Sequence, residues 1–355
     1  MVPLHGQTLA SFQESMYFIH YIIIDEMSFI GPKLIQRIDI RLREAFLAHN
    51  QLQFGRRSII LFGDLGQPPL VKDIPTYTST SYGGTLWHSF ITVIKLKKIF
   101  RQTREQPAQI AFRALLSNLR NAERTIGDWK LLMSRSNSTL SSVEQSIFLS
   151  STHLFATNEM VSLHNKRMLL SMGKPIALST VEQLRGFTCT IPDEEQLESK
   201  IPLCIGQEVM LSVNLWVETR LVNGALGQVK EIVYNGGEIP LELPLFVVVQ
   251  FKNYIGPIWD HNIPKNIPLV PISRGLCRQL PLKMAWALTI HKAQALTLQR
   301  ETIDIGNTNH QGLTFIAISR VYDLTSLRIH PTFMFQRYSH IQHSPYVARR
   351  KQEEE

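Results

Sequence analysis

Cysteine and long apolar runs are scarce in this chain of 355 residues, and each shortage excludes a class of protein. The three cysteines, Cys189, Cys204 and Cys277, stand far apart without a C-x-x-C pair. This spacing argues against a zinc site or a disulfide framework, and it predicts core thiols in a reducing compartment. No apolar stretch approaches the roughly 18 residues of a membrane span, and the first ten residues lack the pattern of a signal peptide. We therefore expect a soluble intracellular protein without a membrane partner.

Negative charge is also in short supply, with 29 acidic residues against 37 basic ones and a formal net charge of +8. A basic balance favours polyanionic partners such as nucleic acid. The remaining composition, 44% hydrophobic and 19% charged, is that of an ordinary globular protein, and the length allows two domains.

The stretch "YIIIDEMSFIG" places Asp25 and Glu26 directly after four apolar residues, 21–24. Such a run is typical of a parallel strand covered by helices on both faces, and ligands bind at the carboxyl ends of these strands. An apolar strand that ends in Asp-Glu is the Walker B arrangement of nucleotide triphosphatases. An acidic pair that merely ends a strand is an equally good interpretation of this stretch alone. The pair Asp193 and Glu194, which follows no apolar run, predicts a solvated loop instead.

Alternation of apolar strands and amphipathic helices predicts an α/β protein. Strands that end in polar residues are expected at 21–24, 59–62 and 92–100, and at 153–157 with Asn158 as the cap of the next helix. Helices are expected at 33–47, 105–122, 284–294 and 313–324, with a polar linker at 133–142. Short strands and turns between about 185 and 279 predict a small β-rich insertion, and residues 347–355 predict a disordered charged tail.

Six blocks of sequence resemble the Pif-type (petite integration frequency) DNA helicases of superfamily one, in the branch that includes transposon-encoded, fungal and protist members. In order, the blocks are "YIIIDEMSFIG", "LFGDLGQPPLV", "IFRQ", "LVNGALGQV", "PLKMAWALTIHKAQALTL" and "FIAISRVYDLTSL". The resemblance implies two tandem RecA-like P-loop NTPase domains, with a small β-barrel inserted in the second. It also implies an ATP-dependent helicase that moves 5′ to 3′ on single-stranded DNA.

The resemblance also implies domain boundaries and a cellular role. We expect the end of the first RecA-like domain at 1–105, a helical connection at 106–150, the start of the second RecA-like domain at 151–184, the β-rich insertion at 185–279, the rest of the second domain at 280–330 and the tail at 331–355. The implied partners are ATP, single-stranded DNA and duplex junctions. The implied roles are DNA repair, recombination and telomere maintenance, in the nucleus or alternatively the mitochondrion. The oligomeric state is not readable.

Site residues follow from the same resemblance, position by position. Asp25 would bind Mg²⁺, Glu26 would deprotonate the attacking water, and Gln67 would sense the γ-phosphate. Arg101 and Arg320 would be arginine fingers, a role that suits a guanidinium because it stays charged and pairs with two phosphate oxygens at once. The residues expected to contact the DNA backbone are Thr289, His291, Lys292 and Gln294. Taken without the neighbouring blocks, Gln67 is better explained as part of a polar turn. The alternative for His291 is a histidine in the core.

The sequence contains no P-loop, G-x-x-x-x-G-K-[ST], the motif that wraps backbone amides around phosphates. In the family this loop precedes the Walker B block, so we expect the chain to begin partway through the first RecA-like domain and to expose sheet edge and apolar helix faces. Two interpretations stay open. The chain is either part of an active helicase completed by a further segment, or an inactive remnant that only binds single-stranded DNA.

Overall fold

The computed structural model describes residues 19–67, 74–103, 105–183, 197–235, 243–258, 265–294, 296–306, 312–339 and 345–354. The chain divides into two compact units: residues 1–130, 309–315 and 333–355 form the first, and residues 131–308 and 316–332 form the second. The domain boundaries expected from the sequence stay a prediction. Cys189 and the pair Asp193 and Glu194 lie outside the described residues.

The first unit contains the strand–helix–strand arrangement that the sequence predicts. Strand β1 (Tyr21–Ile24) pairs in parallel with β2 (Ser58–Leu61), and helix α2 (Pro32–Ala45) connects them. Pro32 begins α2, where its missing N–H costs no hydrogen bond. Ile35, Leu42 and other apolar residues of α2 pack against the partly buried Ile22, Ile24, Ile59 and Leu61. This small core fixes the position of both strand ends.

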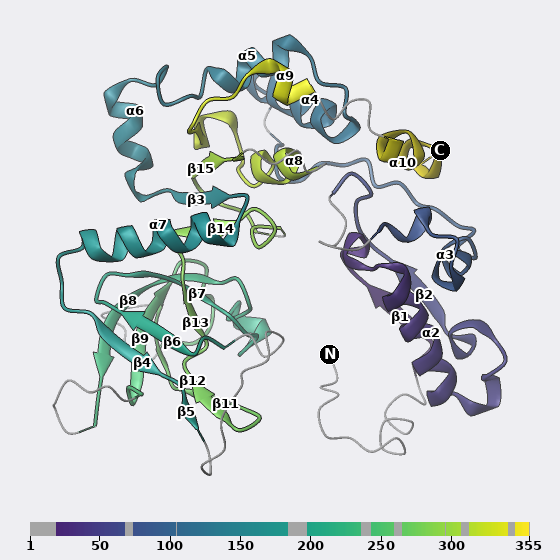
Figure 1. Ribbon diagram of the computed structural model, residues 1–355, viewed down its shortest axis with the longest axis horizontal. Coiled ribbons are helices and arrows are strands. Elements are labelled where there is room, and N and C mark those ends of the chain that lie inside the picture. The colour runs from purple at the N-terminus through teal and green to yellow at the C-terminus, as the bar shows by residue number, and fades with distance from the viewer. Residues whose placement is uncertain are drawn as a thin grey trace. The chain divides into compact units, whose positions relative to one another are not determined.

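The other regular elements of the first unit are helices (Figure 1). They are η1 (Met27–Phe29), η2 (Leu47–His49), η3 (Gln53–Arg56), η4 (Thr76–Thr78), α3 (Tyr82–Trp87), α4 (Pro107–Asn121), α5 (Ile126–Met133), which continues into the second unit, α9 (Phe335–Ser339) and α10 (Pro345–Glu354).

Strand β1 is covered on one face only, which corrects the expectation of a strand buried on both faces. Tyr21 and Ile23 are 68% and 65% exposed, and Ile60 of β2 is exposed beside them. The reason is that α2 covers one face of the two strands, whereas no described element covers the other.

The strand predicted at 92–100 does not form. Residues 91–99 have no regular secondary structure, and all residues from Ile91 to Phe100 are exposed. A strand needs a neighbour for its backbone N–H and C=O groups, and among the described residues this segment pairs with no strand. Apolar alternation alone was therefore a misleading signal here.

The second unit contains a parallel sheet of four strands in the order β14-β3-β15-β16. The strands are β3 (Thr152–Phe155), β14 (Ala287–Thr289), β15 (Glu301–Asp304) and β16 (Leu327–Ile329). Helix α7 (Asn158–Ser171) follows β3, and Figure 1 shows it between the parallel strands and the antiparallel strands of the same unit. The remaining helices of this unit are α6 (Ser142–Ile147), η5 (Phe148–Ser150), η8 (Val217–Thr219), η9 (Leu324–Ser326) and α8 (Leu313–Ile318), which the two units share.

The β-rich insertion is an antiparallel sheet in the order β10-β9-β8-β7-β13, with two smaller sheets, β11-β12-β5 and β4-β6. Its buried core includes Val209, Leu211, Val249 and Leu282. The strands are β4 (Ala177–Thr180), β5 (Glu182–Gln183), β6 (Lys200–Leu203), β7 (Glu208–Leu211), β8 (Leu226–Val233), β9 (Phe246–Phe251), β10 (Asn266–Leu269), β11 (Ile272–Arg274), β12 (Cys277–Gln279) and β13 (Leu282–Met284).

Three expectations for the second unit need correction. Residues 284–294 form strand and turn rather than helix, because buried apolar residues pair with β7 and β3 and a short apolar run does not distinguish the two states. Thr157, not Asn158, caps α7, since its hydroxyl accepts the Met160 N–H. Cys204 is a buried thiol as expected, but Cys277 takes part in a disulfide.

The tail predicted to be disordered contains α10, which belongs to the first unit. Its sequence is rich in good helix formers, and Val347 packs against Ala122 at the end of α4. Among the described residues, no helix has both the length and the apolar character needed to cross a bilayer.

Candidate functional site

Asp25 and Glu26 lie where β1 ends, as the Walker B pattern predicts. Asp25 is exposed, and its Oδ1 accepts the N–H of Glu26 at 2.8 Å. Glu26 has a φ of 53°, a left-handed conformation that is uncommon for residues other than glycine and that clusters at functional sites. This conformation turns the chain into η1 immediately after the strand.

Gln67 lies in a turn after β2, the neighbouring strand. The Met27 N–H donates to the Phe62 carbonyl at 2.8 Å, which ties the two strand ends together. Gly63 permits this contact, because a Cβ there would lie 2.8 Å from the Met27 nitrogen. Asp64 then closes the turn: its carboxylate accepts the Gly66 N–H at 2.8 Å, and its carbonyl accepts the Gln67 N–H at 3.0 Å. The structure thus brings Asp25, Glu26 and the turn of Gln67 to one edge of the sheet.

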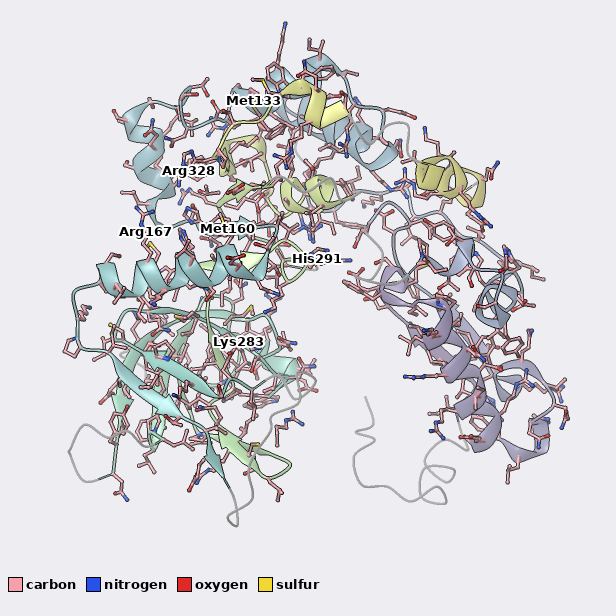
Figure 2. The ribbon with its side chains drawn as sticks, in the orientation of Figure 1. Met133, Met160, Arg167, Lys283, His291 and Arg328 are labelled. Carbon is pink, nitrogen blue, oxygen red and sulfur yellow. The ribbon has the colours of Figure 1, made fainter. Side chains whose placement is uncertain are left out.

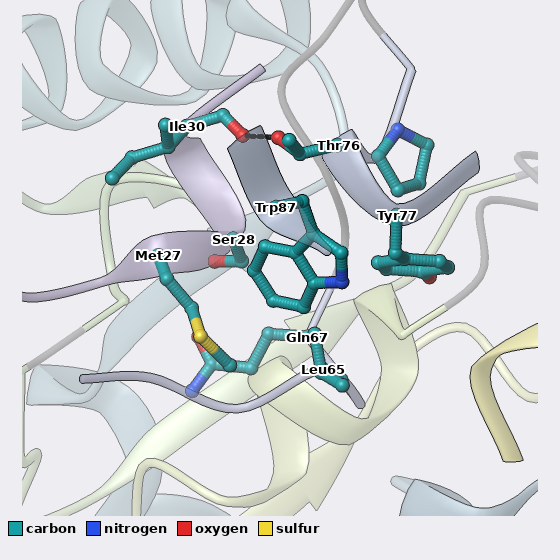
Figure 3. Close-up of a pocket in the computed structure, with 9 residues that line it drawn as sticks. Met27, Ser28, Ile30, Leu65, Gln67, Thr76, Tyr77 and Trp87 are labelled. Carbon is teal, nitrogen blue, oxygen red and sulfur yellow. Dashed lines mark hydrogen bonds between the residues drawn. The ribbon is translucent and has the colours of Figure 1, made fainter. Parts of the chain in front are cut away.

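A small hollow lies beside this edge, and Gln67 contributes to its lining (Figure 3). Met27, Ser28, Tyr77 and Trp87 also line it, and the Tyr77 and Trp87 rings lie 6.1 Å apart. Burial raises the pKa of the Tyr77 hydroxyl, so this side chain is a neutral hydrogen-bonding group near neutral pH. The hollow therefore has one polar amide on an otherwise largely apolar wall.

The exposed Asp25 carboxylate fits a magnesium ion that is held mainly by a nucleotide. Mg²⁺ usually keeps several waters and binds through one or two carboxylates together with substrate phosphates. Within the described part of the chain, no three His, Cys, Asp or Glu side chains gather as a metal cage. A single carboxylate at a strand end is the arrangement that suits a phosphate-bound ion.

Arg101 is half-buried and follows the exposed segment 91–100. The next residue, Gln102, is buried, and its carbonyl accepts a hydrogen bond from the Arg113 guanidinium of α4 at 2.9 Å. The backbone beside Arg101 is therefore anchored to a helix. Its role as an arginine finger stays a prediction.

The four residues expected to contact DNA lie together in the second unit: Thr289 ends β14, and the other three lie in the turn that follows it. Thr289 and Gln294 are buried, and the Thr289 hydroxyl accepts the Lys292 N–H at 3.3 Å. His291 is half-buried and Lys292 is exposed. Thr289 and Gln294 thus shape the turn, whereas His291 and Lys292 are placed on its surface.

Lys292 has a second ammonium group nearby, that of Lys283 on β13; Figure 2 labels Lys283 and, on the turn, His291. Lys292 as a whole is exposed, but its ammonium group is partly desolvated. This desolvation, and to a lesser degree the charge of Lys283, lowers the pKa of Lys292. The Lys283 ammonium lies 3.4 Å from the Glu198 carboxylate. Two neighbouring cations with one carboxylate favour an anionic ligand such as a phosphate.

Arg320 is buried immediately after α8. Its Nε donates to the Ile316 carbonyl at 2.9 Å, and its Nη2 donates to the Ser319 hydroxyl at 2.6 Å. The Leu298 N–H donates to the Arg320 carbonyl at 2.9 Å, so the residue is tied to the chain that follows the DNA-contact turn. In this structure the guanidinium is directed toward its own helix end, and its role as a finger stays a prediction.

Sequence reasoning missed Lys283 and the ion pair of Asp64 with Arg120. Lys283 lies in the same sequence block as Lys292. The two lysines become neighbours only because β13 pairs with β7 and β14 pairs with β3. The Arg120 Nη2 lies 2.7 Å from Asp64 Oδ1, across 56 residues of sequence. A single arginine on a helix face carries no signal for a contact of this range.

Known proteins match this chain along most of its length. The family model described as PIF1-like helicase matches residues 7–128. The ATP-dependent DNA helicase PIF1 of Xenopus laevis is 28% identical, over 87% of this chain and 46% of its own length. The Pif1 helicase of Campylobacter jejuni is 23% identical, over 92% of this chain and 72% of its own length. The chain thus spans about half the length of vertebrate relatives such as the Xenopus helicase.

Solved structures share the fold. The crystal structure of Pif1 helicase from Candida albicans has a TM-score of 0.71 at 21% identity, covering 99% of this chain and 82% of that one. Pif1 helicase from Bacteroides in complex with ADP-AlF3 and ssDNA has a TM-score of 0.65 at 22% identity, covering 94% of this chain and 76% of that one. These similarities confirm the expected α/β fold of RecA-like domains.

Proposed function

We propose that the chain is a PIF1-like helicase and forms the motor part of an ATP-dependent enzyme that moves 5′ to 3′ on single-stranded DNA, since the PIF1-like helicase model matches residues 7–128 and PIF1 helicases match most of the chain. The observation that carries this proposal is the shared sheet edge in the first unit. There, Asp25 and Glu26 end one parallel strand, and the turn of Gln67 follows its neighbour. This pairing of an acidic strand end with a polar turn suits phosphoryl transfer to water.

Each residue at this edge has a distinct task in the proposed reaction. Asp25 would hold Mg²⁺, which neutralises phosphate charge when it is bound. Glu26 accepts a proton from the attacking water and orients that water toward the γ-phosphate. Gln67 donates its amide to a γ-phosphate oxygen and so distinguishes ATP from ADP. Arg101 and Arg320 stabilise the charge that develops on the transferred group. Arg320 would first have to give up its bonds to Ile316 and Ser319.

The proposed partners of the second unit are single-stranded DNA and duplex junctions. Lys292, its neighbour Lys283 and His291 would contact phosphate oxygens, which position DNA without reading its sequence. The Bacteroides neighbour in complex with ADP-AlF3 and ssDNA supports both ligands for this fold. Nuclear or mitochondrial DNA repair, recombination and telomere maintenance are the processes proposed for the complete protein.

The test of hydrolysis uses a protein in which this chain is joined to a preceding P-loop segment. Glu26→Gln removes the proposed base and should lower DNA-stimulated phosphate release by about 10²- to 10⁴-fold. Glu44→Gln, at a partly exposed carboxylate on α2, is the matched control and should keep the full rate. Undiminished hydrolysis in Glu26→Gln would overturn the assignment.

A second candidate function is binding of single-stranded DNA without turnover, and the cationic pair in the second unit favours it. Lys292→Ala should weaken binding at all sequences and reduce the slope of log affinity against log salt by about 1. Lys166→Ala, at an exposed lysine on α7, is the control. If the chain binds no DNA even at low salt, this function is excluded.

A further inference from the structure

Helix α10 ends in two carboxylates that are bound by other parts of the first unit (Figure 1). Negative charge at a helix C-terminus is unfavourable, because the last carbonyl groups already carry partial negative charge. Glu353 and Glu354 would therefore destabilise α10 if the helix were isolated. Arg350 of the same helix lies 3.8 Å from the Glu354 carboxylate, and the structure adds a partner outside the helix for each of the two glutamates.

Glu354 reaches the turn of Gln67 through Arg120 of α4. The Arg120 Nη2 donates to Glu354 Oε1 at 2.8 Å and its Nη1 to Oε2 at 3.3 Å, a two-pronged arrangement. The same guanidinium donates from Nε to Asp64 Oδ1 at 2.8 Å. Asp64 in turn holds the Gly66 and Gln67 N–H groups. Desolvation lowers the pKa of Arg120, but the bonds and charges of Asp64 and Glu354 outweigh it, and the pKa lies above its usual value.

Glu353 contacts the aromatic lining of the hollow. Its Oε2 accepts the indole N–H of Trp87 at 3.0 Å, and Trp87 lines the hollow together with Gln67 (Figure 3). The end of one helix therefore contacts two parts of the site: the turn of Gln67 through Arg120, and Trp87 directly.

The remaining contacts of α10 keep it in place. Arg350 is 1% exposed, and Val347 packs against Ala122. The Lys351 ammonium of α10 lies 2.8 Å from the carboxylate of Glu123, which follows α4, and this pair includes neither Asp64 nor Trp87. Lys351 is thus a natural control for the two glutamates.

We propose that α10 positions Gln67, with Arg120, Glu353 and Glu354 as positioning residues for the γ-phosphate contact. The proposal rests on the proposed role of Gln67. When α10 is docked, the Asp64–Gln67 turn is held from outside the sheet. When α10 is released, Arg120 loses its bonds to Glu354. Arg120 then holds Asp64 less firmly, and the turn becomes more mobile.

The experiment measures amide hydrogen exchange of residues 63–67 and the indole N–H resonance of Trp87 in this chain, without ATP. The double change Glu353→Ala and Glu354→Ala should accelerate exchange in 63–67 about tenfold and shift the indole signal. Alanine favours helix, but the double change also removes the carboxylate beside the buried Arg350, so exchange of the α10 peptide is measured in the same experiment. Arg120→Lys, which keeps the charge but loses the two-pronged geometry, should accelerate the same peptide. Lys351→Ala should leave both signals unchanged.

Unchanged exchange in 63–67 while the α10 peptide itself exchanges faster would overturn the proposal. So would equal acceleration in Lys351→Ala, because the effect would then be general loosening. None of these readouts requires hydrolysis. Accelerated exchange in a protein that never hydrolyses ATP would therefore support the positioning role while contradicting the proposed helicase function.

Discussion

At the scale of single residues, His153 in β3 is an unusual group because its surroundings keep it neutral. Burial, and then the nearby charges of His164 and Arg328, lower its pKa to about 3. The His153 and His164 rings lie 4.1 Å apart, and burial also lowers the pKa of His164. Protonation of either ring would place a cation in a poorly solvated contact.

This arrangement predicts a loss of stability in mild acid. Below about pH 6.5 the unfolded imidazole takes up a proton that the folded one refuses until about pH 3, so the free energy of unfolding falls as pH falls through this window. Between pH 7 and 5.5 the expected loss from His153 is about 1 kcal/mol. In urea titrations at the two pH values, the fall in the free energy of unfolding should be about 1 kcal/mol smaller for His153→Gln than for the unchanged protein. His88→Gln, at an exposed histidine, should behave like the unchanged protein, and an identical acid loss in His153→Gln would contradict the account.

Asp39 on α2 is a buried charge that the hydrophobic pattern did not reveal. It is 1% exposed, lies 2.9 Å from Arg43 Nε, and accepts hydrogen bonds from the Phe54 N–H at 2.6 Å and the Tyr82 hydroxyl at 3.0 Å. Asp39→Ala leaves these donors without their acceptor and should lower the free energy of unfolding by about 3 kcal/mol. Glu44→Ala, which breaks an exposed pair with Arg41, should cost less than about 0.5 kcal/mol. Similar costs in urea denaturation would refute the assigned burial.

At the scale of elements, segment 91–100 presents six large apolar side chains to solvent and pairs with none of the strands that the structure describes. Ile91, Ile94 and Leu96 are 92%, 81% and 83% exposed. Changing these three to Gln should reduce concentration-dependent association, measured by light scattering, because unpaired apolar segments promote it. The unfolding midpoint should stay the same, since no core contact is lost. A lowered midpoint would show that these side chains are packed after all.

Elements with both a periodic pattern and a boundary signal were predicted correctly. Helices α2 and α4 each combine an amphipathic face with a proline in the first turn. Errors arose where the state depends on distant partners. Segment 92–100 alternates like a strand but pairs with no strand in the described part of the chain. Residues 284–294 look helical but join two sheets, and α10 becomes ordered through contacts with α3 and α4.

At the scale of the whole molecule, the order of motifs predicted more than any single motif. The strand-end position of Asp25 and Glu26 and the turn of Gln67 follow from local sequence, and the structure brings them to one edge. The ion-pair network of Asp64, Arg120 and Glu354 could not be predicted from the sequence. Arg120 is 56 residues from Asp64 and 234 residues from Glu354. The roles of Arg101 and Arg320 stay predictions, since each needs a ligand to define it.

The most direct test of the helicase assignment is strand separation on tailed duplexes, by the chain joined to a preceding P-loop segment. The account predicts that a duplex with a 5′ single-stranded tail is separated in the presence of ATP and Mg²⁺. Glu26→Gln should bind the same DNA and separate none of it. Separation that persists in Glu26→Gln, or that occurs only with a 3′ tail, would contradict the account.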